Sequence, residues 1–246
     1  LFQKNYYMHK YKNIAKVILL LFVVVFLYAF SSVRSRQFMI EKTNIKFIGK
    51  DHLLISKDMV NKLLIQNQQP VECMPKDILD LNELESKISL HPMIKNAEVY
   101  LTVNGEVRVE VEQRTPLARV ISEPSFYVDS QGKMMPLSSE YSARVVLVHG
   151  NVDASNLEAL NRLLKHVTND DFLNLYVTEI SINDENQFSL FMRTYDFEVV
   201  VGTLKNLNKK LKNFKAFYQK AKKDKLLESY KTVNLQFNRQ VVCTKI

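Results

Sequence analysis

The sequence predicts an α+β protein in which a single N-terminal transmembrane helix precedes a β-α-α-β-β module and a strand-rich β domain with two helices. Three observations support this prediction. An uninterrupted apolar run extends from Val17 to Phe30, alternating valines flank Asn104-Gly105 as in a β-hairpin, and short alternating segments dominate beyond Leu117. The expected boundaries are a cytoplasmic tail at 1–13, the transmembrane helix at 14–33, a linker at 34–42, the first module at 43–115 and the β domain at 116–246.

The N-terminal apolar run is long enough to cross a bilayer. Residues 14–33 contain one charge, Lys16, and a helix of this length spans about 30 Å, the thickness of the hydrocarbon core. The alternative is a cleaved signal peptide, because the uninterrupted stretch is short and Ala29 and Ser31 form a small-x-small pair. Both alternatives export the rest of the chain, and the short preceding tail favours a cytoplasmic N-terminus. The residues that represent the span are Ile14, Val17, Leu21, Val25, Tyr28 and Val33.

The first module is expected to contain one strand, two helices and a hairpin, in that order. Apolar residues alternate at 45–47 as in a short strand, and Ser56 is a candidate N-cap for the first helix. Asp80 and Glu83 form a capping box for the second helix. The two helices are expected to cover one face of a small sheet.

The register of the hairpin is predicted from the need for a single apolar face. A two-residue loop would place Val103 opposite Glu106 and would put the two apolar rows on opposite faces of the sheet. A three-residue loop, Asn104 to Glu106, keeps both rows on one face. This loop predicts three cross-strand pairs: Val103 with Val107, Leu101 with Val109, and Val99 with Val111.

The β domain is expected to combine strands with two helices. Ser155 and Glu158 form a capping box that opens the first helix, and the second helix runs from Leu204 to Lys222. Strands are expected at 126–128, 134–137, 144–149, 177–182, 188–193 and 197–201, followed by a last strand from Thr232 to Cys243.

The last strand is a candidate binding edge. A terminal strand often lies at the edge of a sheet, where another chain can extend it through its unpaired backbone groups. The alternatives are an interior strand, or an edge blunted by Arg239 and Lys245.

The second helix of the β domain is strongly basic. The segment Leu204 to Lys223 contains eight lysines and no acidic residue, and its apolar residues recur at spacings of three and four. We expect the apolar stripe to pack on the sheet and the lysines to face water. The functional alternative is attraction to anionic phospholipid, to an anionic wall polymer or to an acidic partner.

No residue pattern indicates an enzyme, so we expect no catalytic, cofactor-binding or metal-binding residue. The sequence lacks the glycine-rich motifs of nucleotide-binding and esterase sites, and its five histidines show no metal-ligand spacing. Neighbouring carboxylates at 170–171 and 184–185 fall in expected loops, where carboxylates are ordinarily solvated. Cys73 and Cys243 lie far apart and form no disulfide framework, which leaves free thiols and a single bridge both open.

Three stretches of the sequence carry a resemblance to a known family. They are HPMIKNAEVYLTVNGEVRVEVEQRTPLARV (His91 to Val120), SFYVDSQGKMMPLSSEYSARV (Ser125 to Val145) and VNLQFNRQVVCTK (Val233 to Lys245). In the first, a proline-led segment enters a hairpin that ends in Arg114 and Pro116. Together they resemble the FtsQ/DivIB family of bacterial cell-division proteins, in particular members from Bacteroides-like bacteria.

The resemblance implies a non-enzymatic scaffold of the bacterial inner membrane. It implies a POTRA module followed by an FtsQ-type β domain, both in the periplasm at the division septum. The implied partners are the small division proteins FtsB and FtsL, with further division proteins bound by the POTRA module. No cofactor, nucleic acid or small-molecule substrate is implied.

In this family the partner adds a strand at the end of the β domain. On this chain, that property implies contacts at Gln236, Phe237, Arg239, Gln240, Val241 and Val242. The family often has Asp and Arg on either side of the strand's leucine, whereas this chain has Asn234 and Gln236. The position of the strand therefore transfers more safely than any individual contact.

Two other classes of protein stay open at this point. A POTRA-containing export or outer-membrane assembly component is expected to continue into a long run of barrel strands. A membrane-anchored envelope hydrolase would need catalytic residues clustered in the second domain.

Overall fold

The computed structural model describes residues 16–30, 40, 42–49, 54–66, 69–237 and 240–246. The chain forms two compact units. The N-terminal unit comprises Leu1–Ile48, Lys57–His91 and Asn96–Glu112, and the C-terminal unit comprises Gly49–Ser56, Pro92–Lys95 and Gln113–Ile246.

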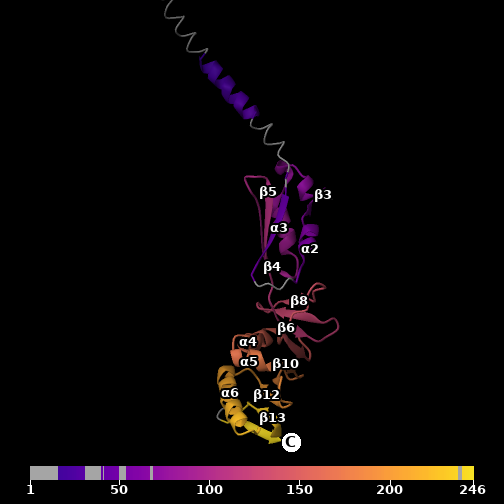
Figure 1. The fold of residues 1–246 in the computed structure, drawn as a ribbon, viewed down its shortest axis with the longest axis vertical. Helices are drawn as coiled ribbons and strands as arrows, with labels where there is room; N and C mark the ends of the chain where they lie inside the picture. Colours follow the sequence, from indigo (N-terminus) through magenta and orange to yellow (C-terminus); the bar gives the residue numbers. More distant parts are fainter. Residues whose placement is uncertain (1–15, 31–39, 41, 50–53, 67–68, 238–239) are drawn as a thin grey trace, which may run out of the picture. The chain divides into compact units, whose positions relative to one another are not determined.

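Residues 16–30 form a helix within the predicted transmembrane segment (Figure 1). Four of the predicted span residues lie on this helix, with exposed fractions that run from 56% at Val25 to 76% at Tyr28. The other two, Ile14 and Val33, lie outside the described residues. No helix in the described part of the chain combines the length and the apolar character needed to cross a membrane.

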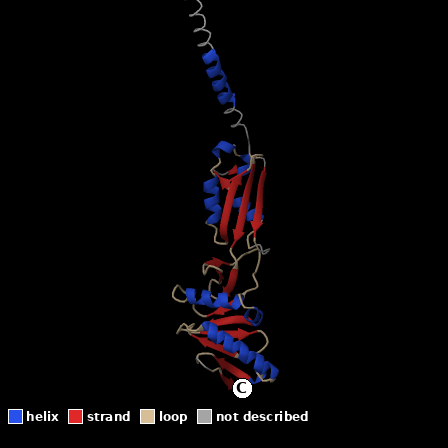
Figure 2. Cartoon of the chain, turned by 90° about the vertical axis from the view of Figure 1, so that its left-hand side faces the viewer, coloured by secondary structure: helices blue, strands red, loops and turns tan. Residues whose placement is uncertain are grey.

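The N-terminal unit has the predicted β-α-α-β-β order. Its three-stranded sheet has the order β1–β5–β4, with β1 (Lys42–Ile48) parallel to β5 (Glu106–Gln113), and β4 (Ile94–Leu101) at one edge. The helices α2 (Lys57–Leu63) and α3 (Leu81–Ser89) lie on one face of the sheet (Figure 2). Between the two helices lie the short strands β2 (Ile65–Gln66) and β3 (Gln69–Pro70) and the 3-10 turns η1 (Val71–Cys73) and η2 (Lys76–Ile78).

The core of this unit follows from the alternation seen in the sequence. Because successive side chains of a strand point to opposite faces, every second residue of β5 meets the helices. The fully buried residues of β5 and α3 are Val107, Val109, Val111, Leu84 and Ile88. The carboxylate of Asp80 caps α3 as predicted, accepting a hydrogen bond from the Glu83 N–H at 3.0 Å.

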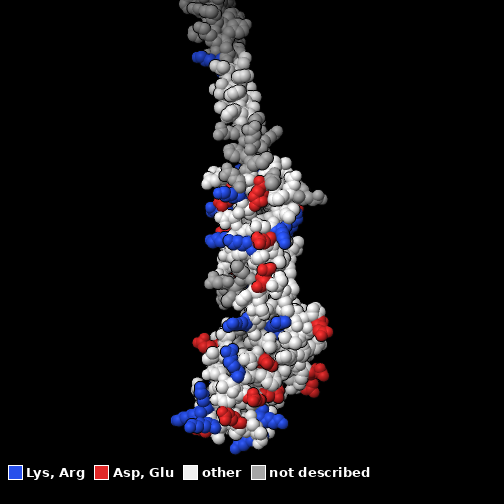
Figure 3. Space-filling view, turned by 45° about the vertical axis from the view of Figure 1, so that its right-hand side comes forward, with Lys and Arg blue, Asp and Glu red and all other residues white. Residues whose placement is uncertain are grey.

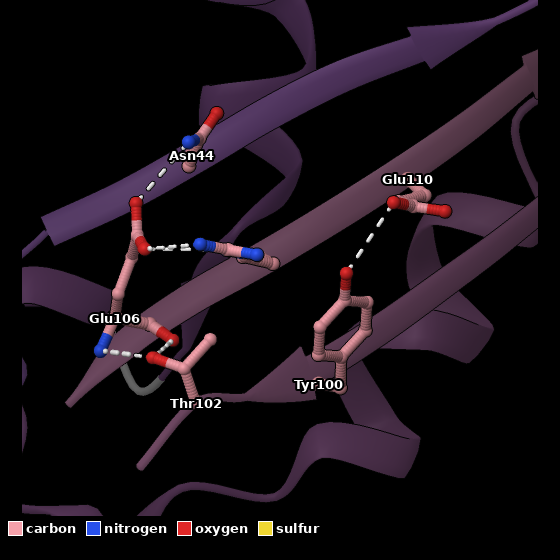
Figure 4. Close-up of polar contacts among 6 residues, drawn as sticks. Asn44, Tyr100, Thr102, Glu106 and Glu110 are labelled. Atoms are coloured by element: carbon pink, nitrogen blue, oxygen red, sulfur yellow. Dashed lines mark hydrogen bonds and ion pairs between the residues drawn. The ribbon is translucent and has the colours of Figure 1, made fainter. Parts of the chain in front are cut away.

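The predicted register of the hairpin is wrong, because the loop lies one residue earlier in the chain. The Thr102 N–H donates to the Glu106 carbonyl at 2.9 Å, and the Gly105 N–H donates to the Thr102 carbonyl at 3.1 Å. The Thr102 hydroxyl also bonds to the backbone of Glu106 (Figure 4). The loop is therefore Val103 to Gly105, and Val103 is fully exposed instead of facing the helices.

The backbone of Gly105 explains the observed loop. Gly105 has φ +80°, the left-handed conformation that closes the common three-residue hairpin loop and that glycine adopts most readily. Both registers keep the valines of β5 on one face, so the apolar pattern alone could not choose between them. The position that requires glycine decides the register.

The corrected register predicts opposite outcomes for two neighbouring substitutions. Val103→Asp should change the free energy of unfolding by less than about 0.5 kcal/mol, because the side chain is exposed in a turn. Gly105→Val should cost about 1–3 kcal/mol, because a β-branched residue is strained at positive φ. Urea unfolding followed by circular dichroism measures both. A severe loss with Val103→Asp and none with Gly105→Val would restore the register predicted from sequence.

The C-terminal unit is built on a nine-stranded mixed sheet. Its strand order is β14–β13–β12–β11–β10–β9–β6–β7–β8, and β10, β11 and β12 form the predicted antiparallel meander. The strands are β6 (Pro116–Val120), β7 (Phe126–Asp129), β8 (Met134–Pro136), β9 (Val146–His149), β10 (Val177–Ile182), β11 (Phe188–Met192), β12 (Glu198–Gly202), β13 (Tyr230–Asn234) and β14 (Val242–Lys245).

The helices of this unit lie together on one side of the sheet (Figures 1 and 2). They are α4 (Leu157–Thr168), α5 (Asp171–Tyr176), α6 (Leu207–Lys223) and the 3-10 turn η3 (Leu227–Ser229). Alternate residues of the strands are buried against them, among them Val148, Ile180, Leu190, Val199 and Val233. This is the single main core of the unit.

Two local predictions for these helices are wrong. α5 was expected to be a loop with solvated carboxylates, but Asp170 caps it by accepting a hydrogen bond from the Leu173 N–H at 3.1 Å, and Asp170 also pairs with Lys215 of α6. The described part of the β domain therefore has one α-helix more than predicted. The predicted Ser155 cap of α4 is replaced by Asn156, because the Ser155 hydroxyl donates to Asp153 instead.

Candidate functional site

The end of the chain forms one edge of the nine-stranded sheet. β13 runs parallel to β12, and β14 runs antiparallel to β13 with Asn234 opposite Val242, Val233 opposite Cys243 and Thr232 opposite Thr244. Since β14 is the outermost strand, its far side pairs with no other described strand. An edge of this kind can accept a strand from another chain.

The predicted last strand, Thr232 to Cys243, is two strands. β13 ends at Asn234, where the side-chain oxygen of Asn234 accepts a hydrogen bond from the Gln236 N–H at 2.8 Å. Asparagine makes such local bonds in turns, and here the bond directs the chain out of the sheet. The chain returns as β14 after a connection that includes Asn238 and Arg239, which lie outside the described residues. The polar run at 238–240 was the only sequence signal for this break.

Gln236, one of the predicted contact residues, is exposed and makes contacts within the chain. Its side-chain N–H donates to the Gln187 side chain, between β10 and β11, at 3.1 Å. It also packs on Gly202, where an added Cβ would lie 2.5 Å from the Gln236 nitrogen. Gln236 therefore holds the connection onto the sheet, and because its side chain is also exposed, its contact with a partner stays a prediction.

The other predicted residues differ in how accessible they are. Phe237 and Val242 are 47% and 38% exposed. Gln240 is exposed, and Val241 is partly buried against the core. Arg239 lies outside the described residues. The structure thus brings Phe237 and Val242 to the surface near the edge and turns Val241 inward.

The backbone of β14 shows which groups face outward. The Ile246 N–H donates to the Ser229 carbonyl at 3.0 Å, so it points toward β13. Because successive residues of a strand direct their N–H and C=O groups to alternate sides, the backbone groups of Cys243 and Lys245 point away from β13. Neither residue was among the predicted contacts, because the sequence does not reveal the break in the strand or the register of β14.

Two other edge strands, β4 and β8, differ from β14. In the N-terminal unit, the N–H of Val99 on β4 donates to the carboxylate of Glu85 at 3.2 Å, which occupies that edge. At the opposite end of the nine-stranded sheet, β8 is three residues long and includes Pro136, which has no N–H. Among the described residues, no side chain forms a hydrogen bond with the outward backbone groups of β14.

Cys243 is a free cysteine, and its side chain lies on the core side of β14. It is partly buried, and burial raises its pKa above the ordinary value for a thiol. A raised pKa keeps the thiol protonated at neutral pH, so Cys243 acts as a small apolar residue at this edge. The side chain of Cys73 is not among those described.

α6 fixes the strands next to this edge. Phe214 and Tyr218 of α6 are buried in the core, where desolvation raises the pKa of Tyr218 to about 12. The ammonium group of Lys210 donates to the Val201 and Thr203 carbonyls at 2.8 and 2.7 Å, at the end of β12. Burial lowers the pKa of Lys210, and the two carbonyls compensate its desolvation.

The remaining lysines of the basic segment mostly face solvent, as predicted. Lys215 pairs with Asp170, and the exposed members are Lys205, Lys209, Lys212, Lys220, Lys222 and Lys223. Figure 3 shows basic side chains gathered at the lower end of the C-terminal unit. Within the described residues, no group of three or more His, Cys, Asp or Glu side chains could hold a metal ion.

Comparison with known proteins agrees with this architecture. Residues 115–244 match the family model described as FtsQ/DivIB, C-terminal related, and residues 39–112 match that of a POTRA-like domain. The chain is 25% identical over 172 residues to the cell division protein FtsQ of Salinibacter ruber (strain DSM 13855 / M31). The aligned region covers 63% of this chain and 66% of that protein, slightly less than two thirds of its length.

A solved structure is also similar, the major extracytoplasmic domain of the trans isomer of the cell division protein DivIB from Geobacillus stearothermophilus. The similarity has 14% identity and a TM-score of 0.26, and covers 32% of this chain and 71% of that one. The match of the C-terminal related family model to more than half of the chain establishes the relationship by itself. This protein is a member of the FtsQ/DivIB family of cell-division proteins.

Proposed function

We propose that this protein is a non-enzymatic scaffold of the bacterial division complex, anchored in the inner membrane through residues 14–33. In this proposal the N-terminus is cytoplasmic, and both units lie in the periplasm at the septum. Membership of the FtsQ/DivIB family supports the division role. The apolar helix at 16–30, whose side chains are exposed all round, supports the anchor.

The proposed partners are division proteins of the FtsB and FtsL type, with others bound by the POTRA-like unit. The observation that carries this proposal is the open edge at β14. A partner strand would pair with the outward backbone groups of Cys243 and Lys245, and its side chains would meet Phe237 and Val242. Backbone pairing supplies affinity in this mode of binding, and the side chains on either side supply specificity.

Depletion of the protein in its own bacterium separates this proposal from the export alternative. A division scaffold should leave long, unseparated cells, because septum formation fails while growth continues. Light microscopy measures cell length, and immunoblots of outer-membrane proteins provide the second readout. Loss of outer-membrane proteins with normal cell length would replace the division role by export.

A proline at Lys245 tests strand addition directly. Lys245→Pro removes an N–H that makes no bond within the sheet, so the fold should persist, whereas a partner strand loses a hydrogen bond and meets the proline ring. We expect capture of the periplasmic parts of FtsB and FtsL by the full chain in detergent to weaken at least about tenfold, or about 1.4 kcal/mol. Lys245→Ala is the control for the lost charge. Equal weakening by both variants would show that charge, and not the backbone, is recognised.

Phe237→Glu tests the apolar contact beside this edge. The side chain is half exposed, so a carboxylate should be tolerated by the fold but should oppose an apolar partner surface. Capture should fall about tenfold, whereas Leu175→Glu, on the exposed side of α5, should leave capture unchanged. If Phe237→Glu binds like the wild type, then the connection between β13 and β14 is outside the interface.

A further inference from the structure

The face of the nine-stranded sheet opposite α4, α5 and α6 is uncovered over most of its width. Directly paired residues of neighbouring strands share a face, so the strand registers define rows of side chains across the sheet. One row is Thr244, Thr232, Glu198, Phe191, Glu179, Leu147, Arg119, Tyr127 and Met135. Only Tyr127 and Met135, at the far end, are buried, and there Leu54 and Met93 pack on them. From Thr244 to Arg119 no residue of the row is buried: Thr244 is exposed and the others are partly exposed, and we call this part the open row.

The composition of this row differs from that of a purely solvated face. Solvated faces of antiparallel sheets are ordinarily polar throughout. Here Phe191 and Leu147 are part of the row, and Val200 and Val242 stand beside it on the same face. Phe191, Leu147 and Val200 are partly exposed, and Val242 is 38% exposed.

Phe191 lies between two carboxylates. Glu198 of β12 is its cross-strand partner on one side, and Glu179 of β10 is its partner on the other. The carboxylate of Glu179 pairs with His149 at 3.3 Å, whereas the carboxylate of Glu198 makes no hydrogen bond or ion pair with any described residue. An aromatic ring flanked by carboxylates is complementary to a lysine or arginine, whose stem packs on the ring and whose charged end meets a carboxylate.

Arg119 supplies the opposite charge at the other end of the open row. Its Nε is buried and has no hydrogen-bond partner among the described residues. A buried unpaired donor is costly, and a partner's acceptor would relieve that cost if binding shifts the Arg119 side chain so that the Nε becomes accessible. Three strand spacings separate β11 from β6 in the sheet order, which places Arg119 about 14 Å from Phe191.

We propose that the partner which extends β14 also lies across this open face, with a lysine or arginine over Phe191 and Glu198 and an acceptor group over Arg119. The inference rests on the proposed function, because the open row is continuous with the edge: Thr244 of β14 begins it. The partner segment is thus required to carry a basic group and an acceptor about 14 Å apart, which four residues of extended chain or about nine of helix can supply.

Charge reversal at Glu198 tests this interface. Glu198→Lys should weaken capture of the periplasmic parts of FtsB and FtsL by about tenfold at low salt, because it replaces attraction by repulsion. Glu158→Lys is the matched control, since Glu158 is exposed on α4, on the opposite side of the sheet. Arg119→Met should weaken capture while leaving the melting temperature equal or higher, because the Arg119 Nε has no partner to lose.

The outcomes separate this inference from the proposed function. Weakening by Glu198→Lys and by Lys245→Pro, but not by Glu158→Lys, supports both proposals. Weakening by Lys245→Pro alone overturns the open-face contact and leaves the edge in place. Equal effects of Glu198→Lys and Glu158→Lys would show a response to net charge only and would also overturn it. Absence of capture by the unmodified chain overturns both, because the inference names that same partner.

Discussion

Burial of one face of the nine-stranded sheet beneath α4, α5 and α6 is the constraint on which the C-terminal unit depends. Strand alternation sends Val148, Ile180, Leu190, Val199 and Val233 into this core. The same alternation necessarily turns the intervening residues to the other face. A one-sided core therefore creates the two surfaces available for recognition, the uncovered face and the edge at which the last strand is left without a neighbour.

The edges at β4 and β8 differ from the edge at β14. In the N-terminal unit, the carboxylate of Glu85 accepts the Val99 N–H and so occupies the edge at β4. At β8 the strand is short and contains Pro136. Such features protect edges from unwanted pairing. β14 is also short and carries Lys245, but it has no proline, and no described side chain hydrogen-bonds to its outward backbone groups. Such an edge is expected where pairing with a partner is the function.

Sequence reasoning predicted the order of most elements, because long periodic segments such as α6 and alternating segments such as β5 carry strong signals. It failed where a single residue decides the outcome. Gly105 sets the hairpin loop, Asp170 opens α5, and Asn234 ends β13, and none of these changes the apolar periodicity around it. The family resemblance predicted binding at the end of the chain, which stays a prediction, and the split of the last strand into β13 and β14 was not foreseen.

The open face could not have been predicted from the sequence at all. Phe191, Glu198 and Glu179 lie on three strands, and only the registers bring them into one row. Within each strand they look like ordinary outward positions. Sites assembled across strands need the pairing of the sheet, whereas helix faces and turns can be judged from local spacing.

Hydrogen exchange of the backbone amides, with and without the periplasmic parts of FtsB and FtsL, tests the central claim most directly. The amides of Cys243 and Lys245 face away from β13, so they should exchange quickly in the free protein. On binding, the account predicts strong protection of these two amides, with little change along β4. Protection confined to other elements, while Cys243 and Lys245 continue to exchange quickly, would contradict strand addition at β14.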